Sequence, residues 1–211
     1  MGSRSFGRLL AGLGLAWLGL VAIPTLPLGG EPASADSEEY PIYDRVVEAK
    51  FLTSETGLVL IRRMTATTVG PSEVAFTRKF FDENQFFDGR LPAALLADFL
   101  LKVTKPSKLD PRFRFGVRYR LVTEFEDGGL EETRTPALGR VRPVQPLGNR
   151  LMLEFSRVAF TPRADQALVY VGNYRPDGTG AGFLVWLARQ GPGWAILDSE
   201  VVWSAVPERE R

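Results

Sequence analysis

The sequence contains no histidine and no cysteine. Without histidine, the Ser-His-Asp triad, the usual zinc sites and imidazole acid–base catalysis are excluded. Without cysteine, thiol nucleophiles, iron–sulfur clusters and redox pairs are excluded. No serine is followed three places later by lysine and no glycine directly precedes a lysine, so S-x-x-K acylases and P-loops are absent too. We therefore expect no metal, no cofactor and no common catalytic motif.

The N-terminus has the pattern of a Sec-type signal peptide. Arg4 and Arg8 precede an apolar run from Leu9 to Leu28, and Ala33-Ser34-Ala35 forms an A-x-A cleavage site. The pattern predicts a signal peptide over residues 1–35 and export to the periplasm or the extracellular space. The alternative is a retained membrane anchor, because the run is as long as a membrane span of about 20 residues. Pro24 and Pro27 argue against that anchor.

Cleavage after Ala35 would leave one domain over residues 36–206 and a loose charged tail over 207–211. The 36–211 part has equal numbers of basic and acidic residues, because the leader removes only Arg4, Arg8 and Glu31. A neutral domain argues against binding to nucleic acid and against stable association with anionic membranes. Secreted eukaryotic domains usually carry disulfides, so a cysteine-free exported chain indicates a bacterial protein.

The first half of the domain is predicted to be helical around one strand. Acidic residues 36–40 are expected to be frayed, a helix follows Pro41, and residues 57–64 form a β-prone run. Ser72 is expected to cap a short helix that reaches Phe80 and Phe81. A second long helix begins at Pro92 and places Leu95, Leu96, Phe99, Leu100 and Val103 on one apolar face.

The second half is predicted to be β-structure. Residues 112–126 alternate apolar and charged side chains, which is typical of a half-buried strand. Residues 127–129 and 136–149 are rich in turn formers. Four strands are expected to form a meander over residues 151–161, 166–174, 182–189 and 194–205.

These elements predict an α+β fold with N-terminal helices packed on a curved antiparallel sheet ending in a four-stranded meander. Residues 167–171 and 183–187 are apolar on both faces, so they are expected to be central strands covered by helices on one side. Such a sheet could close a cone of the ketosteroid-isomerase type. That analogy concerns the fold alone.

Carboxylates are the remaining acid–base groups. Asp98 lies in the predicted helix after Pro92, and Glu154 lies in the first meander strand. Beside a cavity they could have raised pKa values and support hydrolysis or a proton shift. The alternative favours a solvated helix edge for Asp98 and a wet sheet face for Glu154. We prefer that alternative.

One face of the predicted strand 112–126 carries Arg112, Arg114, Arg118 and Arg120. These four arginines form a candidate site for phosphate or carboxylate. The preferred alternative is a solvated face paired with Glu124, Glu126, Glu131 or Glu132 on a neighbouring strand.

Three tryptophans are expected to serve packing rather than a pocket. The glycine run 178–182 is expected to be a hairpin loop, since no helix follows it to hold a pyrophosphate. The three tryptophans are Trp186, Trp194 and Trp203.

The last third of the chain contains F-S-R-V-A-F at 155–160, Q-A-L-V-Y-V at 166–171, and two further segments around Trp194 and Trp203. In these segments the chain resembles an uncharacterised family of exported bacterial proteins, and the remainder matches that family loosely. Ala159 stands where such sequences often have glycine. The resemblance implies export and a shared fold, with no activity attached.

Three functional hypotheses follow. The leading one is a non-catalytic binding or interaction module, because the usual catalytic residue types are missing. The second is a cavity-based hydrolase or isomerase that uses carboxylates. The third is a homodimer in which the arginine row pairs across the sheet face, so that charge reversal at Arg118 would produce monomers.

Overall fold

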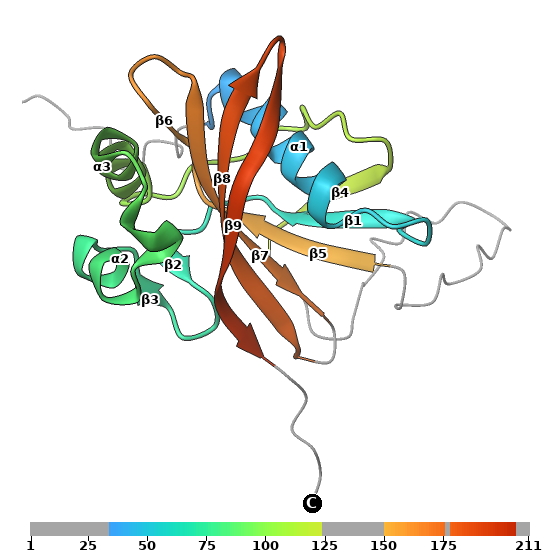
Figure 1. The fold of residues 1–211 in the computed structure, drawn as a ribbon. Helices are drawn as coiled ribbons and strands as arrows, with labels where there is room; N and C mark the ends of the chain where they lie inside the picture. The colour runs from blue at the N-terminus through green and yellow to red at the C-terminus, as the bar shows by residue number, and fades with distance from the viewer. Residues whose placement is uncertain (1–33, 124–149, 176–177, 206–211) are drawn as a thin grey trace, which may run out of the picture. The chain divides into compact units, whose positions relative to one another are not determined.

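The computed structural model describes residues 34–123, 150–175 and 178–205 (Figure 1). These described residues form an α+β domain in which three α-helices accompany a large, mostly antiparallel sheet, and the sequence predicts this fold class. The helices, with two 3₁₀ turns (η), are η1 Ser37–Glu39, α1 Tyr40–Lys50, α2 Arg78–Asn84, η2 Phe86–Gly89 and α3 Ala93–Lys102. The strands are β1 Leu58–Arg62, β2 Thr68–Val69, β3 Val74–Ala75, β4 Arg118–Val122, β5 Arg150–Phe155, β6 Ala159–Phe160, β7 Gln166–Tyr174, β8 Gly180–Gln190 and β9 Gly193–Ala205.

The main sheet has the strand order β4-β1-β5-β7-β8-β9, with β6 paired to β7. Strands β5, β7, β8 and β9 pair antiparallel in succession. Strand β1 is parallel to both of its neighbours, β4 and β5, so the sheet is mixed rather than purely antiparallel. Parallel neighbours need a crossover connection, which here runs from β1 through α2 and α3 before the chain returns as β4.

Both faces of the central strands are covered by helices, whereas the sequence suggested one. Val169 and Val185 belong to one core cluster with α1, and Tyr170 and Leu184 belong to another with α2 and α3. Figure 1 shows α1 on one side of the sheet and α2 and α3 on the other. Each fully buried Val or Leu contributes about 1.5–3 kcal/mol, so both layers stabilise the sheet. This two-sided cover differs from a cone with helices on one face.

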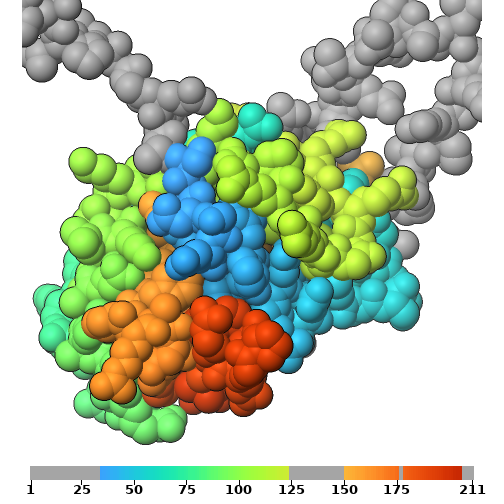
Figure 2. Space-filling view, turned by 90° about the horizontal axis from the view of Figure 1, so that it is seen from above, coloured from blue at the N-terminus to red at the C-terminus, as the bar shows by residue number. Residues whose placement is uncertain are grey.

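Helix α1 begins at Tyr40, directly before Pro41, and buries Tyr43, Val46 and Val47. In Figure 2 its residues lie between the segment that precedes β4 and the β8–β9 hairpin. The contacts agree with this view, because Phe113 and Phe115 share the core cluster of α1, and Ile196 packs against it. The helix therefore joins segments far apart in the sequence.

The acidic start of the domain is ordered, contrary to the expectation of fraying. Residues 37–39 form a 3₁₀ turn, and Glu39 is completely buried. Asp36 forms an ion pair with Arg157 at 2.8 Å. Ala35 is also buried, and its N–H donates to the Lys108 carbonyl at 2.9 Å. Cleavage after Ala35 stays a prediction, because residues 1–33 lie outside the described ranges.

The short helix predicted from Ser72 begins later. Thr77 is the N-cap of α2, and its side-chain oxygen accepts from the Phe80 N–H at 3.1 Å. The expectation for Ser72 was wrong because this residue lies in the turn between β2 and β3. Thr77 has the extended backbone that an N-cap needs.

The alternating run 112–126 is only partly a strand. Strand β4 covers Arg118–Val122, yet the burial pattern extends further back, since Phe113 and Phe115 are buried. The backbone N–H of Arg114 donates to Asp44 in α1 at 2.9 Å instead of to a strand. Alternation here reflects packing against α1 rather than sheet pairing. Residues 124–126, the predicted turn 127–129, the loop 136–149 and the tail 207–211 lie outside the described ranges.

Within the described part of the chain, no helix has both the length and the apolarity needed to span a membrane.

Candidate functional site

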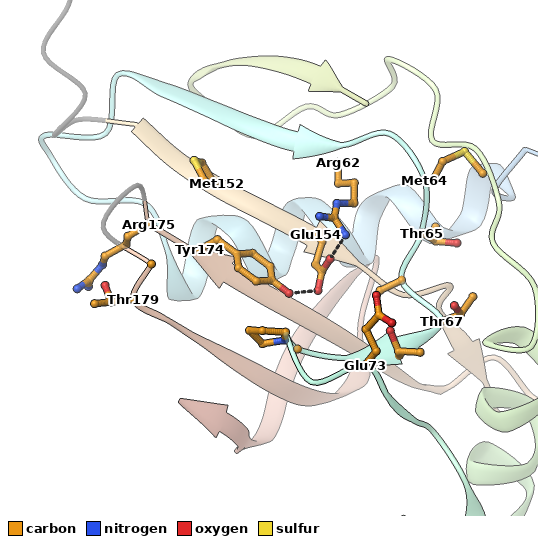
Figure 3. A pocket seen from close by; sticks show the side chains of 15 residues that line it. Arg62, Met64, Thr65, Thr67, Glu73, Met152, Glu154, Tyr174, Arg175 and Thr179 are labelled. Atoms are coloured by element: carbon orange, nitrogen blue, oxygen red, sulfur yellow. Dashed lines mark hydrogen bonds and ion pairs between the residues drawn. The ribbon is translucent and has the colours of Figure 1, made fainter. Parts of the chain in front are cut away.

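A cavity of about 510 Å³ opens where the ends of β1, β5 and β7 meet the segment from Met64 to Glu73 (Figure 3). This volume lies in the usual range for small-molecule sites. Its wall is of mixed polarity and contains threonines, two methionines, two arginines, two glutamates and a tyrosine. The lining residues are Arg62, Met64, Thr65, Ala66, Thr67, Thr68, Gly70, Pro71, Glu73, Met152, Glu154, Tyr174, Arg175, Gly178 and Thr179.

Glu154 lies at the wall of this cavity, and its side chain is only 4% exposed. Oε2 accepts from Nη1 of Arg62 at 3.0 Å. Oε1 accepts from the hydroxyl of Tyr170 at 3.3 Å and from the hydroxyl of Tyr174. Figure 3 shows Arg62 and Tyr174 reaching Glu154 from two different strands. A carboxylate from β5, a guanidinium from β1 and two phenols from β7 thus meet at one point.

Strand pairing explains why these groups meet. Met152 and Glu154 are two residues apart on β5 and so share a sheet face. Glu154 is paired with Gly172 of β7, and Met152 with Tyr174. A Cβ on Gly172 would lie 2.9 Å from both Glu154 Cγ and Tyr174 Cε2. The absence of a side chain at Gly172 therefore leaves the space in which Glu154 and Tyr174 come together.

The local environment shifts the titration of these groups. Burial raises the pKa of Glu154, and hydrogen bonds from Tyr174 and Tyr170 and the charge of Arg62 oppose that rise. Burial also raises the pKa of Tyr174, as does the proximity of Tyr170 and Glu154. Burial raises the pKa of Tyr170 in the same way. Both phenols therefore stay protonated at neutral pH and act as donors to the carboxylate.

Trp203 contacts both tyrosines that donate to Glu154. Nε1 of Trp203 donates to the Tyr170 hydroxyl at 2.7 Å, and the Gly70 N–H donates to the same oxygen at 3.1 Å. The ring of Trp203 also packs against Tyr174, with ring centroids 5.3 Å apart. Trp203 thus orients both tyrosines, and Tyr170 ties the cavity wall at Gly70 to the sheet.

The arrangement is better suited to holding a ligand than to moving a proton. A carboxylate has about four acceptor positions, and three donors already approach Glu154. Arg62, in contrast, has 39% of its side chain exposed. Glu154 therefore fixes the position of a guanidinium and a phenol at the cavity wall, where they can bind a polar ligand.

Asp98, the other predicted carboxylate, lies elsewhere. It stands on α3, where Oδ2 accepts from the Phe160 N–H at 2.8 Å and pairs with Lys102 at 3.2 Å. It does not line the Glu154 cavity. Its contacts tie β6 to α3. The structure does not bring Asp98 and Glu154 together as an acid–base pair.

The arginine row is exposed, and none of its four members lines the cavity. Arg112 pairs with Asp110 at 3.4 Å and lies over the Tyr40 ring. Arg118 and Arg120 stand on β4, at the edge of the sheet. The glutamates proposed as their partners, from 124 onward, lie outside the described ranges. Dimerisation through this row stays a prediction, which sedimentation of Arg118→Glu would check.

The three tryptophans pack as expected, and one also supports the site. Trp186 contacts Phe87, and Trp194 contacts Phe160. Trp203 is the one behind the cavity. The glycine run 178–182 begins in the connection from β7 to β8 and continues into β8, which starts at Gly180. Strands β7 and β8 pair antiparallel from Tyr174 and Gly180 onward, so the connection is a hairpin.

Sequence reasoning missed Arg62, Tyr170 and Tyr174, and it assigned Trp203 to packing alone. Arg62 and Tyr174 each end a β-strand, but nothing in their spacing relates them to Glu154. Their proximity arises only from strand order. A glycine opposite a buried glutamate, as at Gly172, is a signal that needs the strand register to be read.

Over residues 34–123, 150–175 and 178–205, no three acidic side chains are grouped so that they could hold a metal ion. No family model, no curated protein and no solved structure matches this chain.

Proposed function

We propose that this chain is an exported bacterial protein whose domain binds a small polar organic molecule without catalysing a reaction. The ligand occupies the cavity of about 510 Å³ beside Glu154. The observation that carries the proposal is the state of Glu154, whose oxygens are engaged by Arg62, Tyr170 and Tyr174 while Arg62 stays 39% exposed. A buried carboxylate that holds a guanidinium in place prepares a binding surface and has little access to a ligand proton.

Export to the periplasm or the extracellular space rests on the N-terminal pattern, and the resemblance to exported bacterial proteins agrees with it. The equal numbers of charges in residues 36–211 support a domain that does not adhere to nucleic acid or membranes. The succession of β5, β7, β8 and β9 supports the proposed meander.

Native mass spectrometry of the protein, purified gently from a bacterial periplasm, tests the proposal. We expect the wild-type protein to retain a small mass, and Arg62→Gln to lose it because the guanidinium at the wall is gone. Arg118→Gln is the matched control, since it removes an exposed arginine that does not line the cavity. A bare wild-type protein would favour a protein-interaction role instead, and partner capture would follow.

The second candidate is a hydrolase or isomerase that uses Glu154 as its acid. The raised pKa of Glu154 and its place in the cavity wall favour this candidate. It requires turnover of a substrate that Glu154→Gln abolishes while Arg118→Gln leaves it intact. Such turnover would replace the binding proposal.

A further inference from the structure

A second cavity, of about 270 Å³, lies beside the C-terminal end of α1 and the start of β5. Leu151 and Asn173 line this cavity, whereas their neighbours Met152 and Tyr174 line the first one. Because successive side chains of a strand point to opposite faces, the two cavities lie on opposite faces of the sheet. Arg175 lines both. The other lining residues of the second cavity are Lys50, Phe51, Thr53, Glu55, Thr56 and Arg150.

The charge of this cavity is unbalanced. Lys50, Arg150 and Arg175 line it, and Glu55 is the one carboxylate among the described lining residues. Nζ of Lys50 donates to the Ser199 hydroxyl at 2.7 Å and lies over the Phe183 ring, so these contacts leave its charge uncompensated. Burial accordingly lowers the pKa of Lys50.

Arg150 adds a second, independent observation. Its Nε is buried and finds no acceptor among the described residues. A buried N–H without an acceptor is costly, so turning the Arg150 guanidinium toward an oxyanion in the cavity that it lines would relieve this cost. Guanidinium groups also match the geometry of oxyanions by donating two parallel hydrogen bonds.

We propose that this second cavity binds a doubly charged tetrahedral oxyanion, either inorganic phosphate or the phosphate group of a small molecule. Three cations facing one carboxylate are balanced by an anion of two charges. The hydroxyls of Thr53 and Thr56 and the amide of Asn173 line the same cavity and can complete the hydrogen bonding. This site is separate from the ligand cavity at Glu154, apart from the shared Arg175.

Isothermal titration calorimetry of the periplasmic protein tests the site, with inorganic phosphate as the probe at constant ionic strength in chloride buffer. We expect saturable binding that Arg150→Gln and Lys50→Gln each weaken about tenfold or more. Arg120→Gln, an exposed arginine of β4, is the matched control and should bind phosphate as the wild type does. Thermal unfolding verifies that each variant is folded.

Three results would overturn the proposal: no saturable heat, acetate binding as tightly as phosphate, or Arg120→Gln weakening binding as much as Arg150→Gln. Glycerol 2-phosphate distinguishes the two sources, since tighter binding than that of phosphate assigns an organic phosphate and equal or weaker binding assigns the inorganic ion. Arg62→Gln should leave phosphate binding unchanged while it removes the mass retained at Glu154. Failure of one site is thus distinguishable from failure of the other.

Discussion

Two buried glutamates of this domain are surrounded by the same residue types but have different access to solvent. The Glu39 cluster contains Glu39, Tyr43 and Arg157, and the Glu154 cluster contains Glu154, Tyr170, Tyr174 and Arg62. In each, a tyrosine and an arginine that is distant along the chain meet one carboxylate. Composition alone would give them the same role.

The two clusters differ in how exposed their arginine is. Arg157 is 14% exposed, and its guanidinium donates to Glu39, to Ser107 and to Asp36. Glu39 also accepts from Tyr43 and from the Val158 N–H at 2.9 Å, which closes the cluster. Arg62 is 39% exposed at the wall of a cavity. Arg62 reaches a cavity and Arg157 is enclosed by its partners. This difference in access, rather than residue type, makes the Glu154 cluster a candidate binding site, whereas the Glu39 cluster serves to hold the fold together.

The largest change in unfolding free energy is expected when Glu39 and Glu154 are replaced, one at a time, by alanine. Glu39→Ala leaves Arg157 buried without its main counter-charge, which costs about 3–5 kcal/mol of unfolding free energy. Glu154→Ala should cost less, because Arg62 can turn toward water. Urea unfolding measures both values. Equal losses would mean that access to the cavity does not separate the clusters.

A smaller effect is expected from an alteration behind the Glu154 cluster alone. A Cβ on Gly182 would lie 2.0 Å from Trp203 Nε1, so Gly182→Ala displaces the tryptophan that holds Tyr170. We expect a loss of about 1–3 kcal/mol in urea unfolding, together with loss of the retained ligand. Gly57→Ala is the matched control, since nothing lies within 4 Å of a Cβ there. Similar losses for the two variants would contradict this account of Trp203.

The pH dependence of stability gives a directional test of Glu154. Because burial raises its pKa above the ordinary 4.5, the folded protein binds this proton more tightly than the unfolded chain does. The unfolding free energy should therefore fall as pH rises from the ordinary to the raised pKa, and stay lowered above it. Glu154→Gln cannot titrate, so unfolding of both proteins from pH 4 to 8 isolates this contribution. A wild type that gains stability over the variant across that interval would refute the raised pKa.

The smallest effect is expected at Asp98. Asp98→Asn removes the ion pair with Lys102, which at a partly exposed helix position contributes about 0.3–0.5 kcal/mol. The amide oxygen of asparagine can still accept from the Phe160 N–H. We expect near-native unfolding and an unchanged retained mass in native mass spectrometry. Loss of that mass would place Asp98 in the site after all.

Local pattern predicted the elements well and their partners less well. The helix expected after Pro92 is α3, Ala93–Lys102, and the strand expected over 166–174 is β7, because both depend on a continuous apolar pattern. The alternation over residues 112–126 led to the prediction of one long strand, of which β4 forms only a part. The prediction went too far because alternation indicates only which side chains are buried. Phe113 and Phe115 are buried beside α1, not in a strand.

The sequence indicated one residue of the candidate site, Glu154, but not the residues that surround it. Glu154 stood out as a carboxylate within an apolar strand, but the preferred interpretation placed it on a wet face, and its burial corrects that interpretation. Arg62 lies 92 residues away along the chain, too far for any local pattern to connect the two.

The sequence by itself determined the absence of histidine and cysteine chemistry, the α+β class and the positions of most helices and strands. These follow from residue identity and from periodicities of a few residues. Tertiary structure decided that β1 lies between β4 and β5, that helices cover both sheet faces, and that Arg62 and Tyr174 meet at Glu154. Such pairings join segments distant in the chain, and they are selected by burial and strand register, which no local pattern encodes.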